Sequence, residues 1–387
     1  MRGQRGPGVL ARWMVVAALA AAPAPLAPQE VRLEEVNCPG CRLELHRVVE
    51  LGDAQGPGRL DQTLASWAAD SRGRILLASG WQVPVRVFGA DGRFAGTIQP
   101  TLPGDTLPLS IGLVAVTAGD TVNLVDDLRG LHLVLHADGN LVRTHTPTPL
   151  RPASMRLLLP GGRAVGTGTV ATRDNVGYPL HLLGPDGAVL RSFGADVAED
   201  VPGQSMDLRK LALAGPDAVW AGHLTRFGIE RWTLDGERQA ALVRDVPWFA
   251  PYTDMRWRPD QAPHPILMAL RQDAAGRLWS VVRVADERWR DARPLIADTL
   301  LARRNPAAQY DPEELYDTMV EVIDPACGRV LLSRRFPGLI AGFLDDGRMV
   351  SWSDRPGAHP RLTVWRVDAA FDGAPACAVG GERPLSQ

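Results

Sequence analysis

Lysine is almost missing from this 387-residue chain: Lys210 is the only one, so arginine supplies the other 41 of its 42 basic residues. Clusters of arginine are therefore weak evidence of function here. Neither sign of charge is in excess, because 42 basic residues face 44 Asp and Glu. A general nucleic-acid binder would show a basic surplus, so we expect no nucleic-acid partner.

Long apolar runs are also missing after the first 28 residues, which argues against a membrane span in the mature chain. Residues 1–28 have the pattern of an export signal. Arg2, Arg5 and Arg12 form a basic start, and the apolar stretch 13–22 is too short to cross a membrane. Cleavage after Ala20 fits the small-residue rule, and a retained short anchor is the alternative. The sequence predicts an exported protein, periplasmic or extracellular.

Catalytic signatures are missing as well. The chain has no HExxH, no G-x-S-x-G and no phosphate-binding glycine loop. The sequence leaves the catalytic residues, if there are any, unknown, and we predict no metal site and no cofactor. Acidic and amide loop residues nevertheless leave a channel cation such as calcium open as an alternative. These residues are Asp126, Asp127, Asp174, Asn175 and Asp354.

Glycine and proline, by contrast, are frequent, with 39 and 32 residues, and many glycines mark two tight turns that alternate along the chain. The first turn recurs at Gly73, Gly119, Gly162, Gly215, Gly276 and Gly347. The second recurs at Gly92, Gly139, Gly187, Gly236, Gly328 and Gly373, mostly after Asp. Asp-Gly between apolar runs is a strong hairpin signal. The pattern gives six units of four strands each.

Small four-stranded sheets have two apolar faces and bury them by stacking around a ring, so the sequence predicts an all-β, six-bladed β-propeller. The segments AADSRGRILLAS, RQDAAGRLWSVV and FLDDGRMVSWSD resemble repeats of propellers of the NHL/TolB-like kind. The resemblance covers residues 42–371. It implies the blade topology and leaves function open, since this architecture hosts binders, hydrolases, lactonases and lyases.

A propeller must join its last blade to its first. The strand expected at 42–51 has no partner of its own, so we expect it to become the outer strand of blade six, beside the strand at 361–367. The chain then divides into a signal and leader (1–28), a cysteine-bearing segment (29–41), the propeller (42–371) and a tail (372–387). We expect a monomer.

The four cysteines, Cys38, Cys41, Cys327 and Cys377, should meet at the bottom edge of blades five and six, where the first-to-second and third-to-fourth turns lie. Two disulfides that lock the ring suit an exported protein. Bridges that close loops of hundreds of residues would add about 4–5 kcal/mol in the chain-entropy model. The sequence does not choose among three connectivities. A four-thiolate zinc site and a redox role for Cys38 and Cys41 are weaker alternatives.

Two long segments should lie on the opposite, top face near blades four and five. Residues 285–317 interrupt blade five, with a helix expected from Pro294 to Arg304 and another start at Asp311. Residues 244–267 connect blade four to blade five and carry four aromatic residues, Trp248, Phe249, Tyr252 and Trp257. These aromatics would stack against a ligand. Alternatively, the insertion packs on them and buries them.

Arginines in the top loops, Arg129, Arg173, Arg226 and Arg355, would form a basic ring around the channel mouth. We expect a ligand- or protein-binding module that takes a protein, peptide or glycan through this face. Trp248, Phe249, Tyr252, Trp257, Arg173, Arg226 and Arg355 are the candidate binding residues. The alternative is a hydrolase or lactonase-like enzyme with a metal or acidic site at the channel mouth.

Overall fold

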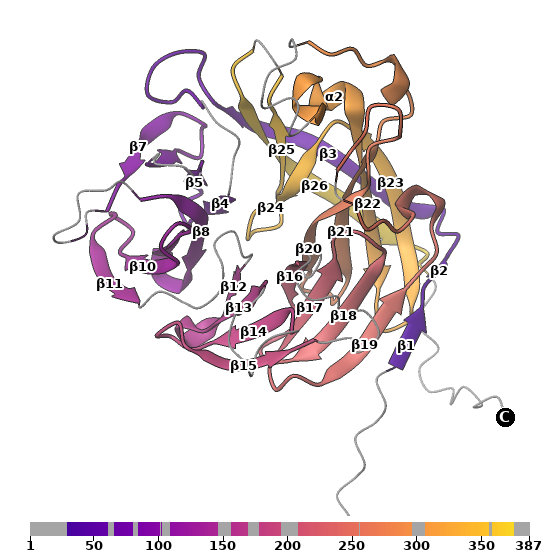
Figure 1. Ribbon diagram of the computed structural model, residues 1–387, viewed down its shortest axis with the longest axis horizontal. Coiled ribbons are helices and arrows are strands. Elements are labelled where there is room, and N and C mark those ends of the chain that lie inside the picture. Colours follow the sequence, from indigo (N-terminus) through magenta and orange to yellow (C-terminus); the bar gives the residue numbers. More distant parts are fainter. Residues whose placement is uncertain are drawn as a thin grey trace, which may run out of the picture.

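The computed structural model describes residues 29–60, 66–79, 84–100, 102, 109–145, 156–168, 178–194, 208–254, 256–295, 306–355 and 358–374. In this part the chain forms six sheets arranged around a central axis, each built on four antiparallel strands (Figure 1). The predicted six-bladed β-propeller is therefore confirmed.

In each blade the first strand is innermost. Blade one contains β4 (Ser66–Ala69), β5 (Ile75–Ala78), β6 (Val85–Phe88) and β7 (Phe94–Ile98); blade two contains β8 (Ile111–Thr117), β9 (Thr121–Asp126), β10 (Leu131–Leu135) and β11 (Leu141–His145). Blade three contains β12 (Arg156–Leu158), β13 (Ala164–Thr167), β14 (Leu180–Leu183) and β15 (Val189–Phe193); blade four contains β16 (Arg209–Leu213), β17 (Ala218–His223), β18 (Gly228–Thr233) and β19 (Arg238–Val243). Blade five contains β20 (Ile266–Gln272), β21 (Leu278–Ala285), β22 (Tyr316–Asp324) and β23 (Arg329–Pro337); blade six contains β24 (Ile340–Phe343), β25 (Met349–Ser353), β26 (Arg361–Asp372) and β3 (Gly40–Leu51).

The alternating turns fall where the sequence predicts them. All twelve glycines of the two turn series have positive φ, which a side chain would strain. Asp273 shows how one such turn is fixed. Its Oδ1 accepts the backbone N–H groups of Ala275 and Arg277, and its Oδ2 accepts the Trp279 indole N–H at 3.0 Å. These contacts of Asp273 stabilise the turn.

The core lies between neighbouring blades. Trp220 and Trp279, in the second strands of blades four and five, are 2% and 5% exposed and belong to separate interblade clusters. Each blade therefore buries its apolar faces against its two neighbours, as the stacking argument requires.

The ring closes through strand pairing. β3 lies antiparallel to β26 over eleven residue pairs, from Leu51 opposite Leu362 to Gly40 opposite Asp372. The predicted closure by an N-terminal strand is confirmed, and the pairing is longer than the 361–367 partner strand suggested.

Two short strands before β3 were not predicted. β1 (Gln29–Arg32) pairs parallel with β19, and β2 (Glu34–Glu35) pairs parallel with β23. Each adds a fifth strand to the outer edge of its blade, while Leu33 between them is 5% exposed. The segment before β3 thus runs along blades four and five before it enters blade six.

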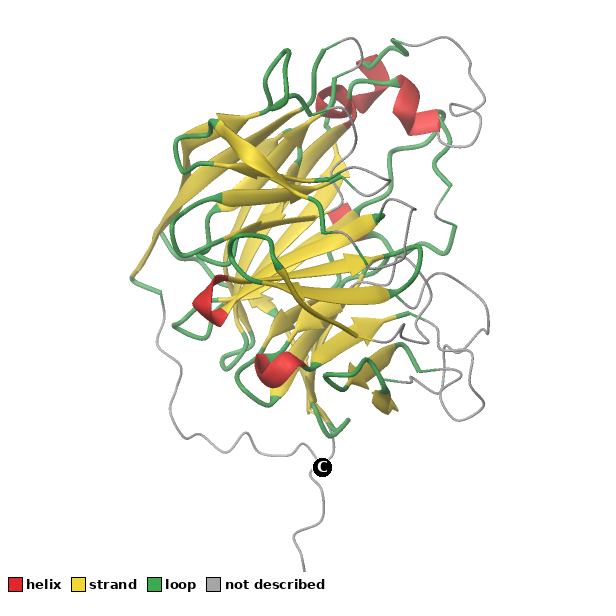
Figure 2. Ribbon diagram, turned by 90° about the vertical axis from the view of Figure 1, so that its left-hand side faces the viewer, coloured by secondary structure: helices red, strands yellow, loops and turns green. Residues whose placement is uncertain are grey.

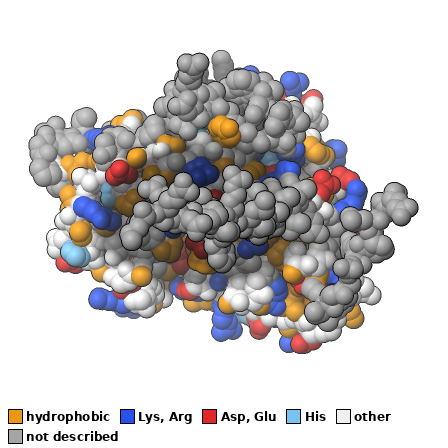
Figure 3. Space-filling view, turned by 90° about the horizontal axis from the view of Figure 1, so that it is seen from below, with side chains coloured by type: hydrophobic (Ala, Val, Ile, Leu, Met, Phe, Trp, Pro, Cys, Tyr) orange, Lys and Arg blue, Asp and Glu red, His pale blue; other side chains and the backbone are white. Residues whose placement is uncertain are grey.

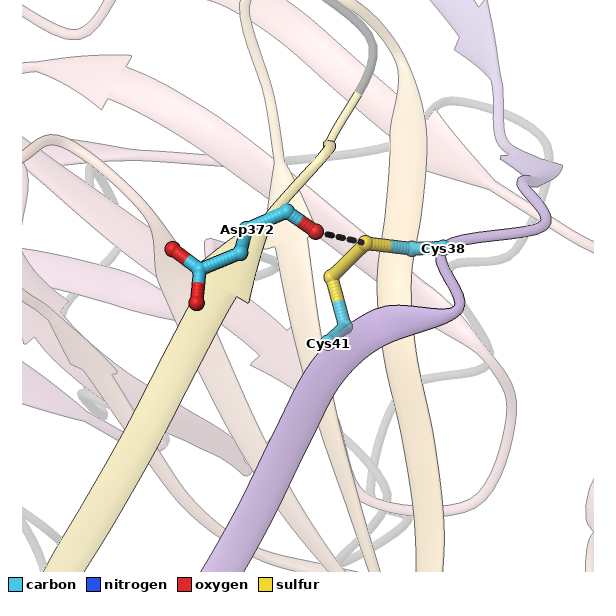
Figure 4. Close-up of a disulfide and its surroundings, with 3 residues drawn as sticks. All are labelled: Cys38, Cys41 and Asp372. Atoms are coloured by element: carbon cyan, nitrogen blue, oxygen red, sulfur yellow. Dashed lines mark hydrogen bonds between the residues drawn. A yellow bond between two sulfur atoms is a disulfide. The ribbon is translucent and has the colours of Figure 1, made fainter.

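Cys38 and Cys41 form a disulfide with each other, at a sequence separation of three residues. The bridge sits beside the end of β26, and Cys38 Sγ lies 3.8 Å from the carbonyl oxygen of Asp372 (Figure 4). Cys327 is also disulfide-bonded, and Cys377 lies outside the described residues. The expectation that these two N-terminal cysteines tie distant parts of the ring together is wrong. Their own closeness in the turn, where Cys41 N–H donates to the Cys38 carbonyl, pairs them locally.

The insertion in blade five lies between Ala285, the end of β21, and Tyr316, the start of β22. Helix α2 (Pro312–Leu315) begins at the expected cap, where the Asp311 side chain accepts the Glu313 N–H. The helix expected at 294–304 lies almost wholly outside the described residues. Figure 2 shows the short helical turns at the ends of the strands, with α2 at one rim.

Charge is mixed among the coloured residues of one face of the molecule (Figure 3). On the face drawn in Figure 3, basic and acidic side chains alternate without an extended area of one sign among the residues coloured. None of the helices in the described ranges has the length and apolar character needed to cross a membrane.

Candidate functional site: a groove between blades five and six

A cavity of about 980 Å³ opens between blades five and six. Its walls are β23 of blade five and the strands β3, β24, β25 and β26 of blade six, with α2 contributing at one end. This volume lies at the upper end of the range typical of small-molecule pockets. Three of the strands that line it are long, with nine residues in β23 and twelve in both β26 and β3.

Apolar side chains form part of the groove lining. Leu45, Phe336, Ile340 and Trp365 line it and also belong to the core cluster between blades five and six. The Trp365 indole N–H donates to Ser351 Oγ at 2.8 Å, which fixes the orientation of this ring. A ligand would therefore meet rigid ring and aliphatic surface.

Charged side chains form much of the remaining lining, and most are paired. Arg361 pairs with Glu50 at 3.2 Å, and Arg355 Nε lies 2.9 Å from Asp311. Ser353 Oγ donates to Glu313 Oε1 at 2.6 Å.

Arg334 differs from the other two arginines of the groove. Its guanidinium lies 5.6 Å from the centroid of the Phe336 ring, and it is exposed. Among the described residues it has neither an ion pair nor a hydrogen bond. Arg334 therefore presents an uncompensated positive charge beside an apolar surface.

The aromatic residues of the 244–267 connection do not line this groove. Trp248 stacks on Phe249 with 5.9 Å between ring centroids, and Phe227 contacts both rings edge-on at 6.4 Å. Phe249 is 3% exposed and part of the core cluster between blades four and five, against which the half-buried Trp248 packs. A binding role for this pair stays a prediction.

Tyr252 stacks on His264 with 4.3 Å between ring centroids and an interplanar angle of 9°. Burial raises the pKa of Tyr252 to about 12, since the phenolate would lose solvation. Its hydroxyl is buried and has no hydrogen-bond partner among the residues described.

Trp257 is buried under the insertion. It is 8% exposed, contacts Tyr310 edge-on at 5.4 Å and packs in a cluster with Leu315 and Tyr316. Its indole N–H donates to the Gln261 carbonyl at 2.8 Å. For Trp257, therefore, the alternative is correct: the insertion in blade five packs on this side chain and buries it.

Replacing Trp257 with alanine should therefore lower the free energy of unfolding by about 3–5 kcal/mol, because a large buried ring is lost. Chemical denaturation measures this. Arg256→Ala, at the exposed neighbouring position, is the control and should change stability little. If Trp257→Ala left the free energy of unfolding nearly unchanged, the buried position of this side chain would be contradicted.

The arginines that were expected to form a basic ring make contacts with different partners. Arg226 donates to His223 Nε2 at 3.0 Å, and burial holds the pKa of this histidine well below its usual value. Arg129 pairs with Asp126, and Arg355 lines the groove described above. Arg173 lies outside the described residues. Each of the three described arginines thus has its own partner.

Asp126 accepts the backbone N–H groups of Leu128 and Arg129, which makes it a loop-forming carboxylate. Burial raises the pKa of both Asp127 and Asp354. Asp174 and Asn175 lie outside the described residues. Within the described ranges, no three His, Cys, Asp or Glu side chains are grouped closely enough to hold a metal ion.

Sequence reasoning found one groove residue, Arg355, and missed the rest. The other lining residues sit on ordinary strands that differ from neighbouring ones only in length. The run Arg361–Asp372, twelve residues without a turn signal, could have indicated a long strand beside the groove, but only 361–367 were expected to form it.

Comparisons with known proteins show a similarity of fold and nothing about function. No protein-family model and no curated protein matches the sequence. A protein of Bacteroides fragilis described as exported superposes with a TM-score of 0.54 at 10% identity, covering 88% of this chain and all of its own. A member of the DUF4221 family from Bacteroides vulgatus gives 0.53 at 8% identity, covering 85% and 99%. Virginiamycin B lyase from Staphylococcus aureus gives 0.42 at 13% identity, covering 84% and 99%. What the chain shares with the first two is its overall architecture. The chain itself is a six-bladed β-propeller closed by its own N-terminal strand.

Proposed function

We propose that this protein is an exported binding module that takes a small molecule with an apolar body and an acidic group in the groove between blades five and six. The observation that carries the proposal is the position of Arg334, which lines a partly apolar cavity of ligand size and has no ion pair among the described residues. An anion is the group that such a site binds best, because charge-assisted hydrogen bonds are stronger than neutral ones.

The remaining polar groups of the groove support selection of one orientation. Arg361 and Arg355 are already neutralised by carboxylates, so a ligand anion gains most at Arg334. The apolar body would then lie along Phe336 and Trp365. A few placed polar groups on an apolar lining are typical of binding pockets.

Export rests on two supporting observations. The first 28 residues have the composition of a signal peptide, and Cys38 and Cys41 form a disulfide, which persists in oxidising compartments.

The test uses two fluorescent probes with similar aromatic bodies, the anionic 8-anilinonaphthalene-1-sulfonate and the neutral N-phenyl-1-naphthylamine. Arg334→Gln should weaken binding of the anionic probe about tenfold, the size expected for one charge-assisted contact, and should leave the neutral probe unaffected. Phe336→Ala should weaken both. Titration calorimetry gives the affinity and the stoichiometry.

The matched control is Arg366→Gln, an exposed arginine of β26 that does not line the groove. It should bind both probes as the unaltered protein does. Equal loss in Arg366→Gln and Arg334→Gln, or no loss in Arg334→Gln, would refute the groove as the anion site.

A further inference from the structure

The single lysine of the chain occupies a special position. Lys210 is the second residue of β16, the innermost strand of blade four, next to the central axis (Figure 1). Everywhere else this sequence uses arginine as its basic residue. The one amine side chain therefore lies where the propeller strands approach the channel.

Strand register gives the direction of this side chain. Lys210 is directly opposite Gly222 of β17, and opposed residues of a pair project from the same side of a sheet. That side faces blade five, because a Cβ added to Gly222 would lie 2.4 Å from Leu267 Cδ2 and 2.9 Å from Leu270 Cδ1. Ala212, two residues further along β16, belongs to the same core cluster as both leucines. The stem of Lys210 thus leaves the strand toward aliphatic surface.

Within the described ranges, no acidic group compensates the amine. Among the described residues, Lys210 has no ion pair and no hydrogen bond from its side chain, and the flanking Arg209 lies opposite His223. Burial lowers the pKa of Lys210 to about 8, because the ammonium loses solvation without a partner. The side chain nevertheless keeps partial exposure. At pH 7 roughly a tenth of the side chains are therefore the free, nucleophilic amine, whereas an ordinary lysine has well under about a thousandth in that form.

We propose that Lys210 is a covalent binding site for a ligand that carries an aldehyde or ketone group. The amine nitrogen adds to the carbonyl carbon and forms a C–N bond. The C–O bond of the resulting carbinolamine then breaks, and the oxygen leaves as water with the two protons that the nitrogen has lost. The product is an imine, formed reversibly and without an oxidant or reductant.

Arginine cannot replace lysine in this role. The guanidinium stays protonated at any pH that the protein tolerates, whereas a desolvated lysine becomes a nucleophile. The chain uses arginine at every other basic position and lysine only here. This choice is consistent with a requirement for a nucleophilic amine at this position. This site is separate from the groove between blades five and six, so either proposal can fail alone.

The experiment traps the imine with acetaldehyde as the carbonyl probe and sodium cyanoborohydride as the reductant. Peptide mass mapping then quantifies ethylation of Lys210, with the α-amino group as the internal reference. At pH 7, Lys210 should be modified about tenfold faster in the native protein than in guanidinium-unfolded protein, where its pKa is ordinary. The rate should rise with a midpoint near pH 8.

Lys210→Arg and Lys210→Met are the controls. Both should lose the modification inside the propeller and keep that of the α-amino group. Circular dichroism establishes that the fold is intact. Native labelling of Lys210 that is no faster than labelling of the unfolded chain, or a rate that rises only above pH 10, would overturn the proposal.

Discussion

Replacing Arg244 with methionine is expected to lower the free energy of unfolding by about 3–5 kcal/mol, since it leaves a buried carboxylate without its counter-charge. Arg244 follows β19 of blade four and donates to Glu321 Oε1 of blade five at 2.6 Å. The Glu321 side chain is 0% exposed. The same guanidinium also donates to Glu35 at 2.9 Å, so one side chain connects blade four, blade five and the N-terminal segment. Equilibrium unfolding in guanidinium chloride measures the loss.

The loss should depend on pH. Burial raises the pKa of Glu321, and Arg244 opposes that rise. Without Arg244 the folded-state pKa rises further above the unfolded value. The folded protein then binds the proton more tightly than the unfolded chain, and stability falls as pH increases between the two values. Arg244→Met should therefore be more destabilised at pH 8 than at pH 5.

Two variants test the cause. Glu321→Gln added to Arg244→Met removes the uncompensated charge and should recover much of the lost stability. Arg32→Met breaks the exposed pair with Asp245, whose side chains are 75% and 91% exposed, and should cost less than about 1 kcal/mol. Two results together would contradict this cause: a loss of stability in Arg244→Met that does not change with pH, and no recovery when Glu321→Gln is added. They would assign the effect to lost packing.

The second large effect concerns ring closure. Leu51→Ala in β3 should lower the free energy of unfolding by about 2–5 kcal/mol, because Leu51 is fully buried in the cluster between blades six and one. The double variant Cys38→Ser/Cys41→Ser should cost about 2 kcal/mol or less, since its bridge closes a very short loop. Strand pairing, rather than this disulfide, is thus expected to hold the ring closed.

Val48→Ala is the matched control for Leu51→Ala. It lies on the same strand, is 49% exposed and should be near neutral. A larger loss from the cysteine variant than from Leu51→Ala would show that the bridge, and not the strand, closes the ring.

The repeat pattern predicts the fold because its signals are local. A glycine such as Gly92 needs only its own turn, and twelve such turns determine six blades. β1 and β2 could not be predicted because strands of four and two residues are too short to show a periodic pattern. Their pairing also depends on blade edges that lie far along the chain. The same limit applies to the cysteines. Sequence places Cys38 near the end of β26, whereas its bond to Cys41 depends on the local turn.

The groove is harder to predict because no residue type marks it. Arg334 and Phe336 are two residues apart on β23 and share one face of it, as polar and apolar residues do in many strands beside solvent. Their importance comes from blade six, whose long strands β26 and β3 stand opposite. Trp257 was expected to be either ligand-binding or buried, and only the three-dimensional position of Tyr310 determines which surface it contacts.

The N-terminal segment also bears on the order of folding. During synthesis it emerges first, yet Arg32 contacts Asp245, 213 residues later, and Arg361 contacts Glu50 across 311 residues. Contacts of such sequence separation form slowly, since a long loop must close before they are made. Blades one to five can assemble before this segment pairs with its partner strands. We therefore expect its docking to be the last and rate-limiting step of folding. Until then, the unpaired edges of blades four, five and six are the surfaces most prone to aggregation.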